Sequence, residues 1–445
     1  MLKRKINNRL NRWIKDSKKA LILSGARQVG KTYSIRNALE KNGCNYIEIN
    51  LVEKPEFIPV LSNSVSVDDM IINLSAALNY SFVPGETICF IDEVQELPDL
   101  ITRIKFWVDD GRFRFILSGS LLGVEMKNIR SVPVGYVEEV EMYPLDFEEF
   151  LVASGVTEEV LSYLKNCFSE KKAVGDLIHQ KMMKHFYRYL VVGGMPDAVR
   201  EYIETGDMNT VSEIQRNIVN LYKRDFTKYE ADNKKLMLES IYDVIPATLL
   251  KQNRRFNYSD IKKGLHFEKA ENSFLWLTSA GVVIPVYNTT EPRISLVQNQ
   301  KSSLVKLYSS DVGLLTYQYG NAFRTQILIQ NDKLNLGGVF ENAVAQQLNA
   351  HGISSWFYNS HKNGEVDFVI EYENRVIPIE VKSGKDYYVH SALDKALENP
   401  EYEIKTAYIF ANCDITVDGR KKYMPIYMCT FLQDETELPV LEPIQ

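Results

Sequence analysis

Short apolar runs alternate with amphipathic segments through the first third of the chain. Strands are predicted at residues 21–23, 46–50, 87–91 and 112–117, and helices at 33–39 and 66–78. The run at 87–91 is almost continuously apolar, which is typical of a strand buried on both faces of a parallel sheet. Strands that alternate with helices predict a doubly wound parallel α/β sheet. Such sheets bind their ligands at the carboxyl ends of the strands.

Helical periodicity dominates the middle of the chain. Helices are predicted at residues 158–168, 173–190, 207–224, 235–250 and 269–280, with a further helix that begins at Ser259. Gly281 ends the last of these, and a strand at 282–287 follows it, which together are typical of a winged helix. A strand and a helix within 304–330 close this region. Basic side chains make the module locally basic, so that DNA contact and packing within the molecule are both open: Lys251, Arg254, Arg255, Lys262 and Lys263.

The C-terminal pattern predicts a helix followed by a hairpin. Phe340, Val344 and Leu348 lie on one face of a helix that begins after residues 337–338. The runs 364–370 and 375–382 then flank a turn at 372–374, which indicates two antiparallel strands.

Length and composition set the limits of the domain organisation. A chain of 445 residues exceeds one hydrophobic core, and we expect domains at 1–150, 151–325 and 326–445. With 45% hydrophobic and 25% charged residues the composition is that of an ordinary globular protein. The net charge of −6 argues against a wholly basic nucleic-acid coat but allows a local basic face. Residues 1–20 form such a face on an amphipathic helix, which either packs beside the first domain or contacts DNA or phosphate.

Targeting signals and cysteine usage favour the cytoplasm. The N-terminal residues lack the apolar core of a signal peptide, and no apolar run has the length of a membrane span. The five cysteines are scattered without C-x-x-C spacing, so neither a disulfide framework nor a zinc site is expected. We therefore expect a cytoplasmic protein without membrane contact.

The first motif with chemistry is G-x-x-x-x-G-K-T at residues 25–32, between a predicted strand and a predicted helix. Glycines let the backbone N–H groups of such a loop face a phosphate, and the helix N-terminus points its free donors at the same place. Lys31 can reach the β- and γ-phosphates of ATP, and the Thr32 hydroxyl can bind Mg²⁺. The expected nucleotide contacts are Gly25, Ala26, Arg27, Gln28, Val29, Gly30, Lys31, Thr32 and Tyr33.

Polar residues follow the two later strands of the same sheet. Asp92 comes directly after the buried strand and is expected to be a Mg²⁺ carboxylate. Its neighbour Glu93 is placed to accept a proton from an attacking water. Ser118 follows the next strand and is expected to sense the γ-phosphate. Without the phosphate-binding loop upstream, a helix N-terminus with a favourable dipole interaction would be the preferred interpretation of the two carboxylates.

A second set of chemical groups lies on the C-terminal hairpin. Glu380 and Lys382 are two residues apart on one strand and therefore share a face, and Asp367 lies on the neighbouring strand. Carboxylate oxygens suit Mg²⁺ or Mn²⁺, which would activate water for phosphate displacement, while Lys382 adds positive charge. The alternative is an ordinary ion pair between Glu380 and Lys382 in a module used only for binding. Pro378 argues against a central position for this strand, since proline cannot donate a hydrogen bond to a central ladder.

These motifs resemble a known family. GARQVGKT, CFIDEVQELP and FILSGS, followed by residues 133–136 and 143–150, are similar to prokaryotic AAA+-type ATPases with a C-terminal DUF4143 domain. The resemblance implies Walker A, Walker B and sensor roles for Lys31 and Thr32, Asp92 and Glu93, and Ser118. It places residues 193–196 in a helical lid and leaves Arg130 and Arg224 as candidates for an arginine finger.

The C-terminal part resembles the PD-(D/E)xK nuclease superfamily and its restriction-endonuclease-like fold. The resemblance assigns Glu341 to the helix, Asp367 to the first core strand, and Glu380 and Lys382 to the next. The proline of the superfamily name is absent before Asp367.

Two functions follow from these motifs. In the first, an ATPase controls a C-terminal metal-dependent DNA nuclease. In the second, ATP binding and slow hydrolysis drive a switch whose last domain only binds DNA or a protein partner. A nuclease with a vestigial ATPase is disfavoured by the complete Walker pair. Ring assembly by identical chains is possible for either function.

Overall fold

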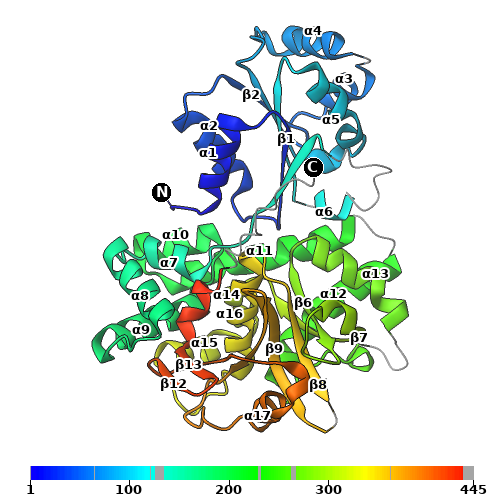
Figure 1. The fold of residues 1–445 in the computed structure, drawn as a ribbon. Helices are drawn as coiled ribbons and strands as arrows, with labels where there is room; N and C mark the ends of the chain where they lie inside the picture. Colours follow the sequence, from blue (N-terminus) through cyan, green and yellow to red (C-terminus); the bar gives the residue numbers. More distant parts are fainter. Residues whose placement is uncertain are drawn as a thin grey trace, which may run out of the picture. The chain divides into compact units, whose positions relative to one another are not determined.

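The structure is a computed structural model that describes residues 2–64, 66–120, 122–125, 135–228, 232–261, 267–360 and 362–433. The chain forms two compact units (Figure 1). The first contains Met1–Tyr143 together with Leu275–Val282, and the second contains Pro144–Phe274 and Val283–Gln445. The chain therefore passes from the second unit to the first and back again around residues 275–282.

A five-stranded parallel sheet forms the centre of the first unit, in the order β2-β3-β4-β1-β5. Its strands are β1 (Ala20–Ser24), β2 (Tyr46–Asn50), β3 (Ile88–Asp92), β4 (Arg114–Ser118) and β5 (Val137–Glu141). The helices of this unit are α1 (Ile6–Asp16), α2 (Lys31–Lys41), α3 (Phe57–Asn63), α4 (Val67–Leu78), α5 (Asp99–Asp110) and α6 (Leu122–Glu125), with a 3₁₀ turn η1 (Val94–Glu96). The predicted strands and their alternation with helices are confirmed.

Burial in this sheet follows the position of each strand. β3 is buried along its whole length, while β2 at one edge alternates between buried and half-buried residues. The strand order places β4 between β1 and β3, so that the carboxyl ends of these three strands are neighbours. The polar residues that follow them in the sequence are thereby brought to one edge of the sheet.

Helices and a mixed sheet of eight strands, in the order β12-β13-β11-β10-β9-β8-β6-β7, make up the second unit. The helices are α7 (Phe147–Ala153), α8 (Glu158–Glu170), α9 (Asp176–Val192), α10 (Pro196–Thr205), α11 (Met208–Lys228), α12 (Asp232–Leu250), α13 (Phe267–Ser279), α14 (Val312–Gln318), α15 (Asn321–Leu328), α16 (Gly337–Ala350) and α17 (Ser391–Glu398). The strands are β6 (Val283–Thr289), β7 (Gln300–Ser309), β8 (Ser355–Ser360), β9 (Gly364–Tyr372), β10 (Arg375–Val381), β11 (Ala407–Ala411), β12 (Thr416–Asp418) and β13 (Lys421–Pro425). The 3₁₀ turns are η2 (Tyr258–Asp260), η3 (Leu296–Asn299), η4 (Pro400–Tyr402) and η5 (Ile426–Phe431).

The strand predicted at 282–287 is present, but it does not form the wing of a separate winged helix. As β6 it pairs antiparallel with β7 and parallel with β8, so it belongs to the C-terminal sheet. Most of its residues are buried, including residues on both faces of the strand. Lys262 and Lys263 of the expected basic module lie outside the described residues.

A central helix, α16, packs into the second unit along most of its length. All residues from Gly337 to Leu348 are buried, which explains why the helix is rich in small and apolar side chains. A Cβ on Gly338 would overlap the carbonyl of Leu249 at the end of α12, so only glycine allows this close approach. The hairpin of β9 and β10 follows as predicted, with Glu373 and Asn374 in the left-handed conformation at its turn.

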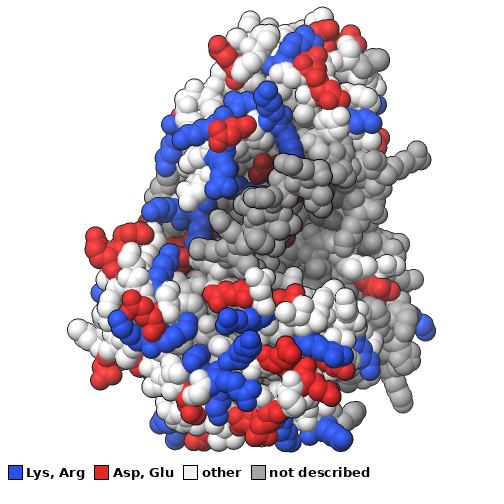
Figure 2. Space-filling model, in the orientation of Figure 1, with Lys and Arg blue, Asp and Glu red and all other residues white. Residues whose placement is uncertain are grey.

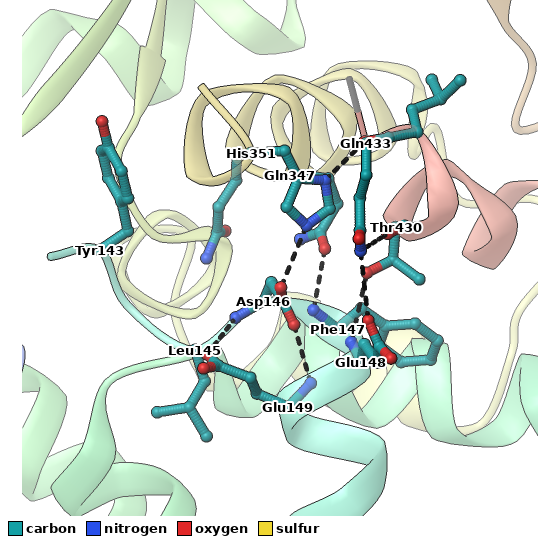
Figure 3. Close-up of polar contacts among 12 residues, drawn as sticks. Tyr143, Leu145, Asp146, Phe147, Glu148, Glu149, Gln347, His351, Thr430 and Gln433 are labelled. Atoms are coloured by element: carbon teal, nitrogen blue, oxygen red, sulfur yellow. Dashed lines mark hydrogen bonds and ion pairs between the residues drawn. The ribbon is translucent and has the colours of Figure 1, made fainter. Parts of the chain in front are cut away.

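Residues 145–149 bind the start of α7 to α16 and η5 (Figure 3). Asp146 accepts from the Glu149 N–H at 2.8 Å, and Glu149 Oε2 accepts from the Asp146 N–H at 3.2 Å, which is a complete capping box. The second carboxylate oxygen of Asp146 lies 3.0 Å from Nε2 of His351. The Phe147 N–H donates to Oε1 of Gln347 at 2.8 Å. A motif known only from resemblance thus has a structural use, because it attaches α7 to the C-terminal module.

The capping box gives a stability prediction. Asp146→Ala removes the cap, worth ~1 kcal/mol, and leaves buried partners unpaired, worth a further ~1 kcal/mol, so the second unit should lose about 2 kcal/mol of unfolding free energy. Urea unfolding measures this loss. Ser66→Ala is the matched control, since Ser66 caps α4 in an exposed capping box in the first unit. Equal losses for the two variants would contradict the contribution of His351.

Candidate nucleotide-binding site and carboxylate cluster

The loop between β1 and α2 has the backbone of a phosphate-binding site. Gly25 and Gly30 take φ values of +136° and +96°, and Gln28 a φ of +67°. A Cβ on Gly25 would overlap the carbonyl oxygen of Met142, so this position requires glycine. α2 begins at Lys31, directly after the loop, and its free N–H groups therefore face the same space.

Lys31 is held over this loop by backbone carbonyls. Its Nζ donates to the carbonyl oxygens of Gly25 and Ala26, both at 2.9 Å. Burial lowers the pKa of Lys31 to about 8, although the charges of Glu93 and Asp92 oppose the shift. A charged phosphate is a stronger hydrogen-bond partner for an ammonium group than a carbonyl is. Lys31 can therefore exchange its bonds to the Gly25 and Ala26 carbonyls for bonds to a phosphate.

Asp92, the last residue of β3, forms hydrogen bonds with α2 and with the ends of β2 and β4. Its Oδ2 accepts from the Thr32 hydroxyl at 2.8 Å and from Nδ2 of Asn50 at 3.4 Å. Its Oδ1 accepts a hydrogen bond from the Ser118 hydroxyl, which is fully buried on β4. A hydroxyl and a carboxylate at hydrogen-bond distance are the oxygen ligands that Mg²⁺ prefers, so Thr32 and Asp92 fit this ion.

Glu93 is oriented by a residue that the sequence analysis did not single out. Glu93 has a left-handed backbone, with φ of +57°, and its Oε2 accepts from Nε2 of Gln95. Gln95 is buried, and a Cβ on Gly119 would overlap its Oε1. Gln95 is one of several polar residues at the end of this strand, together with Asp92, Glu93 and Glu96, so the local sequence does not single it out.

Arg4 is the second residue missed. Of the basic residues in the first helix region Arg4 alone is buried, and its guanidinium donates to the carbonyl oxygens of Val29 at 3.1 Å and Tyr143 at 2.6 Å. It therefore supports the phosphate-binding loop from behind. The other basic side chains of this region are exposed, and Figure 2 shows Lys and Arg gathered over the face that carries α1. A DNA contact by these side chains stays a prediction.

Other expected nucleotide contacts differ in exposure. Tyr33 is 55% exposed beside the loop, Arg27 is half-buried, and both stay predicted contacts. Arg224 is exposed on α11, and Arg130 lies outside the described residues. Gly193 ends α9, and the Gly194 N–H donates to Oδ2 of Asp311 at 2.6 Å within the second unit.

The C-terminal residues also come together. Asp367 on β9 and Glu380 on β10 lie on paired strands, and Oδ2 of Asp367 accepts from the Val381 N–H at 3.0 Å. Nζ of Lys382 lies 3.1 Å from Oε2 of Glu380. Glu341 on α16 is fully buried and faces the same cluster, where Tyr308 donates to its Oε2 at 2.9 Å.

Two cations complete this cluster: Arg254, which the sequence analysis assigned to the basic module, and Lys306, which it did not single out. Arg254 pairs with Oε1 of Glu341. Nζ of Lys306, from β7, lies 2.8 Å from Oε1 of Glu365, 3.6 Å from Oε2 of Glu341 and 3.6 Å from Oδ1 of Asp367. We define the carboxylate cluster as Glu341, Glu365, Asp367 and Glu380. Lys306 is fully buried, so its charge is compensated almost entirely by this cluster.

The electrostatics of the cluster follow from burial and these pairs. Burial and the charge of Asp367 raise the pKa of Glu341 to about 7 and that of Glu380 to about 8. Burial would also raise the pKa of Asp367, but Lys306, the Val381 N–H and Arg254 outweigh it and hold that pKa below its ordinary value. Burial would lower the pKa of Lys306, but the surrounding carboxylates raise it.

A divalent metal does not fit this arrangement as it stands. Among the residues that the structure describes, no group of three or more His, Cys, Asp or Glu is arranged to hold a metal ion. Lys306 lies between the oxygens that would bind the metal, and Arg254 and Tyr308 engage Glu341. The expected Mg²⁺ or Mn²⁺ site at Glu341, Asp367 and Glu380 is thus unsupported by the geometry.

The first unit defines a P-loop NTPase. A glycine loop joins a buried parallel strand to a helix, and Asp92 and Glu93 follow a second strand of the same sheet. Residues 17–151 match the family described as AAA domain, and residues 336–429 match the domain of unknown function DUF4143. The chain thus carries an AAA-type ATPase domain and a DUF4143 domain, as the motifs predict. Residues 183–324 match a further domain of unknown function, DUF8612.

Individual relatives add little beyond these matches. The uncharacterized protein MJ1544 of Methanocaldococcus jannaschii is 24% identical over 371 residues, or 80% of this chain and 73% of that protein. The Walker-type ATPase paby2304 of Pyrococcus abyssi is 16% identical with a TM-score of 0.43, over 72% of this chain and 96% of that chain. Cdc6p of Pyrobaculum aerophilum is 12% identical with a TM-score of 0.26, over 73% of this chain and 94% of that chain. In the part of the chain described here, no helix is both long and apolar enough to span a bilayer.

The lowered pKa of Lys31 predicts a pH dependence of ATP affinity. Below pH 8 the lysine is already charged, and affinity should change little. Above pH 8 the free protein must take up a proton to bind the phosphates, so affinity should fall by up to about tenfold per pH unit. Titration calorimetry at several pH values, in buffers of different ionisation enthalpy, measures both the affinity and the proton uptake. A constant affinity up to pH 9.5 without proton uptake would contradict the assignment, and Lys31→Ala should remove binding altogether.

Proposed function

We propose that this chain is an ATP-driven switch. In this proposal the first unit binds and hydrolyses ATP with Mg²⁺, and its nucleotide state controls a C-terminal module that binds DNA or a protein partner. The observation that carries the proposal is the hydrogen-bonded set of Thr32, Asp92 and Ser118 beside Lys31. Thr32 lies in the first turn of α2, and Asp92 and Ser118 end the neighbouring strands β3 and β4. Together with Lys31 they supply groups that phosphoryl transfer to water requires.

Each residue has a distinct task in the proposed reaction. The loop N–H groups and Lys31 bind the β- and γ-phosphates, and Glu93 takes the proton of a water whose oxygen bonds to the γ-phosphorus. The bond from the γ-phosphorus to the bridging oxygen breaks, and ADP leaves with the electron pair. Mg²⁺, held by Thr32 and Asp92, would offset the phosphate charge. Ser118 is placed to exchange its bond to Asp92 for one to the γ-phosphate.

Two continuous stretches of chain can carry the nucleotide state to the second unit. Arg4 binds both Val29 in the loop and Tyr143, the last residue before the second unit. Two residues after Tyr143, the Leu145 N–H donates to the Gly194 carbonyl at 2.7 Å, within the second unit. In this proposal a displacement of the loop reaches Leu145, two residues before α7 begins, through Arg4 and Tyr143.

The second stretch is the end of α13. Gly281 lies against Ala26 of the loop, where a Cβ would be 3.1 Å from the Ala26 nitrogen. β6 begins two residues later, at Val283, and pairs with β7 and β8 of the C-terminal sheet. This route ends in the strands that surround the carboxylate cluster.

An active nuclease remains the other candidate. It would need Glu341, Asp367 and Glu380 to hold Mg²⁺ or Mn²⁺ beside Lys382, with DNA as substrate. The position of Lys306 among these carboxylates favours a binding module instead. DNA cleavage stays a prediction.

Glu93→Gln tests the ATPase directly. The amide keeps the shape and the hydrogen-bonding capacity toward Gln95 but cannot take a proton, so ATP should stay bound while turnover falls by about 10²–10⁴-fold. Steady-state ATP hydrolysis and ATP binding by calorimetry measure the two effects. The matched control is Glu96→Gln, an exposed acid in the same 3₁₀ turn, which should hydrolyse ATP normally. Full turnover by Glu93→Gln would exclude Glu93 as the base.

Gly281→Ala tests the contact between α13 and the loop. Gly281 has φ of +70°, and its new Cβ would press on Ala26, so ATP turnover should fall roughly three- to tenfold through misplacement of the loop. Gly206→Ala is the control, because Gly206 has φ of +71° with no atom within 4 Å of the new Cβ. It reproduces the backbone strain without the contact. Equal kcat values for the two variants would contradict a role for this contact.

A further inference from the structure

Lys306 is a buried cation inside the carboxylate cluster, contributed by a strand outside the predicted motif. It is 0% exposed, and its Nζ makes ion pairs with Glu341, Glu365 and Asp367 at 3.6, 2.8 and 3.6 Å. Among the described residues it has no well-aligned hydrogen-bond acceptor despite these short distances. An ammonium held by several carboxylates without one aligned bond occupies its site as a point charge does.

The rest of the cluster is balanced around this position. Glu341 is paired with Arg254, and Glu380 is paired with Lys382. Glu365 has a second cation nearby, since Nε of Arg255 lies 3.5 Å from its Oε2. Four acids therefore meet four bases, and the cluster has no surplus negative charge to attract a divalent ion.

The backbone keeps Lys306 in place. It lies in the second half of β7, where every residue from Val305 to Ser309 is buried. The Phe256 N–H donates to the Val305 carbonyl at 2.8 Å. The backbone of Arg255 forms an isolated antiparallel β-bridge with that of Lys306. The aromatic ring of Phe357 lies 5.3 Å from the ammonium and adds a cation–π contact. Withdrawal of the Lys306 side chain to admit a metal would break its ion pairs and this cation–π contact.

We propose that the Lys306 ammonium takes the place of the divalent metal ion in this nuclease-like site, so that the wild-type site binds no divalent cation. The inference is independent of the ATPase, because every residue it uses belongs to the second unit. It predicts that removal of the lysine charge creates a metal site from the existing carboxylates.

Manganese binding to the nucleotide-free protein tests this inference. In the wild-type protein, electron paramagnetic resonance should detect no bound Mn²⁺ that is lost in the Asp367→Asn variant. Lys306→Met keeps most of the length of the side chain but loses its charge, and it should bind one Mn²⁺ more than the wild-type protein does. Asp367→Asn in the Lys306→Met background should remove this ion, which separates it from binding at Asp92.

Two controls and a stability measurement keep the test decisive. Lys301→Met removes an exposed lysine of the same strand and should behave as wild type. Lys306→Arg keeps the charge and should bind no additional Mn²⁺. If Lys306→Met unfolds without metal, Mn²⁺ should restore its fold and raise its Tm, whereas Mn²⁺ should leave the wild-type Tm unchanged. Wild-type Mn²⁺ binding that Asp367→Asn removes, or a Lys306→Met protein that neither binds nor is refolded by Mn²⁺, would overturn the inference.

Discussion

A buried charge must be compensated inside the protein, and both candidate sites depend on this constraint. In the first unit, Lys31 is compensated by loop carbonyls and by the nearby charges of Asp92 and Glu93, which leaves it ready for a stronger anion. In the second unit, Lys306 is compensated by three carboxylates at once. The first arrangement is completed only by a ligand, while the second is complete as it is. Under the two proposals above, this difference separates an ATPase site from a site in which the ion pairs stabilise the fold.

Local patterns were sufficient for much of the fold. The strand before the glycine loop, the buried strand that ends at Asp92 and the hairpin that carries Asp367 and Glu380 all follow from residues close in sequence. β6 shows the limit of local patterns, because they predicted its extended conformation but not the strands with which it pairs. Periodicity reports which faces of a strand are buried, but β8 and β7 lie too far along the chain for the pattern to name them.

The same limit explains the missed site residues. Arg4 and Lys306 act through contacts with distant segments, and nothing in their own neighbourhood marks them. Gln95 contacts its near neighbour Glu93, but it stands among several polar residues that look alike in the sequence. The strand order is another example. Only the sheet shows that β4 lies between β1 and β3, which brings the Ser118 hydroxyl to Asp92. Lys306 changes the interpretation most, because a residue outside the motif lies among the carboxylates that the motif supplies.

The excursion of residues 275–282 into the first unit affects how this protein can be inherited. A domain that occupies one continuous stretch can be copied, lost or exchanged between genes as a single piece. Here the ATPase unit takes one of its packing segments from the middle of the other unit, and Gly281 lies against its phosphate-binding loop. A recombination event at Tyr143 would deliver a nucleotide domain without that segment. Such a chain favours descent of the two units as one gene, and shuffling of the ATPase onto new C-terminal modules would have to carry α13 with it.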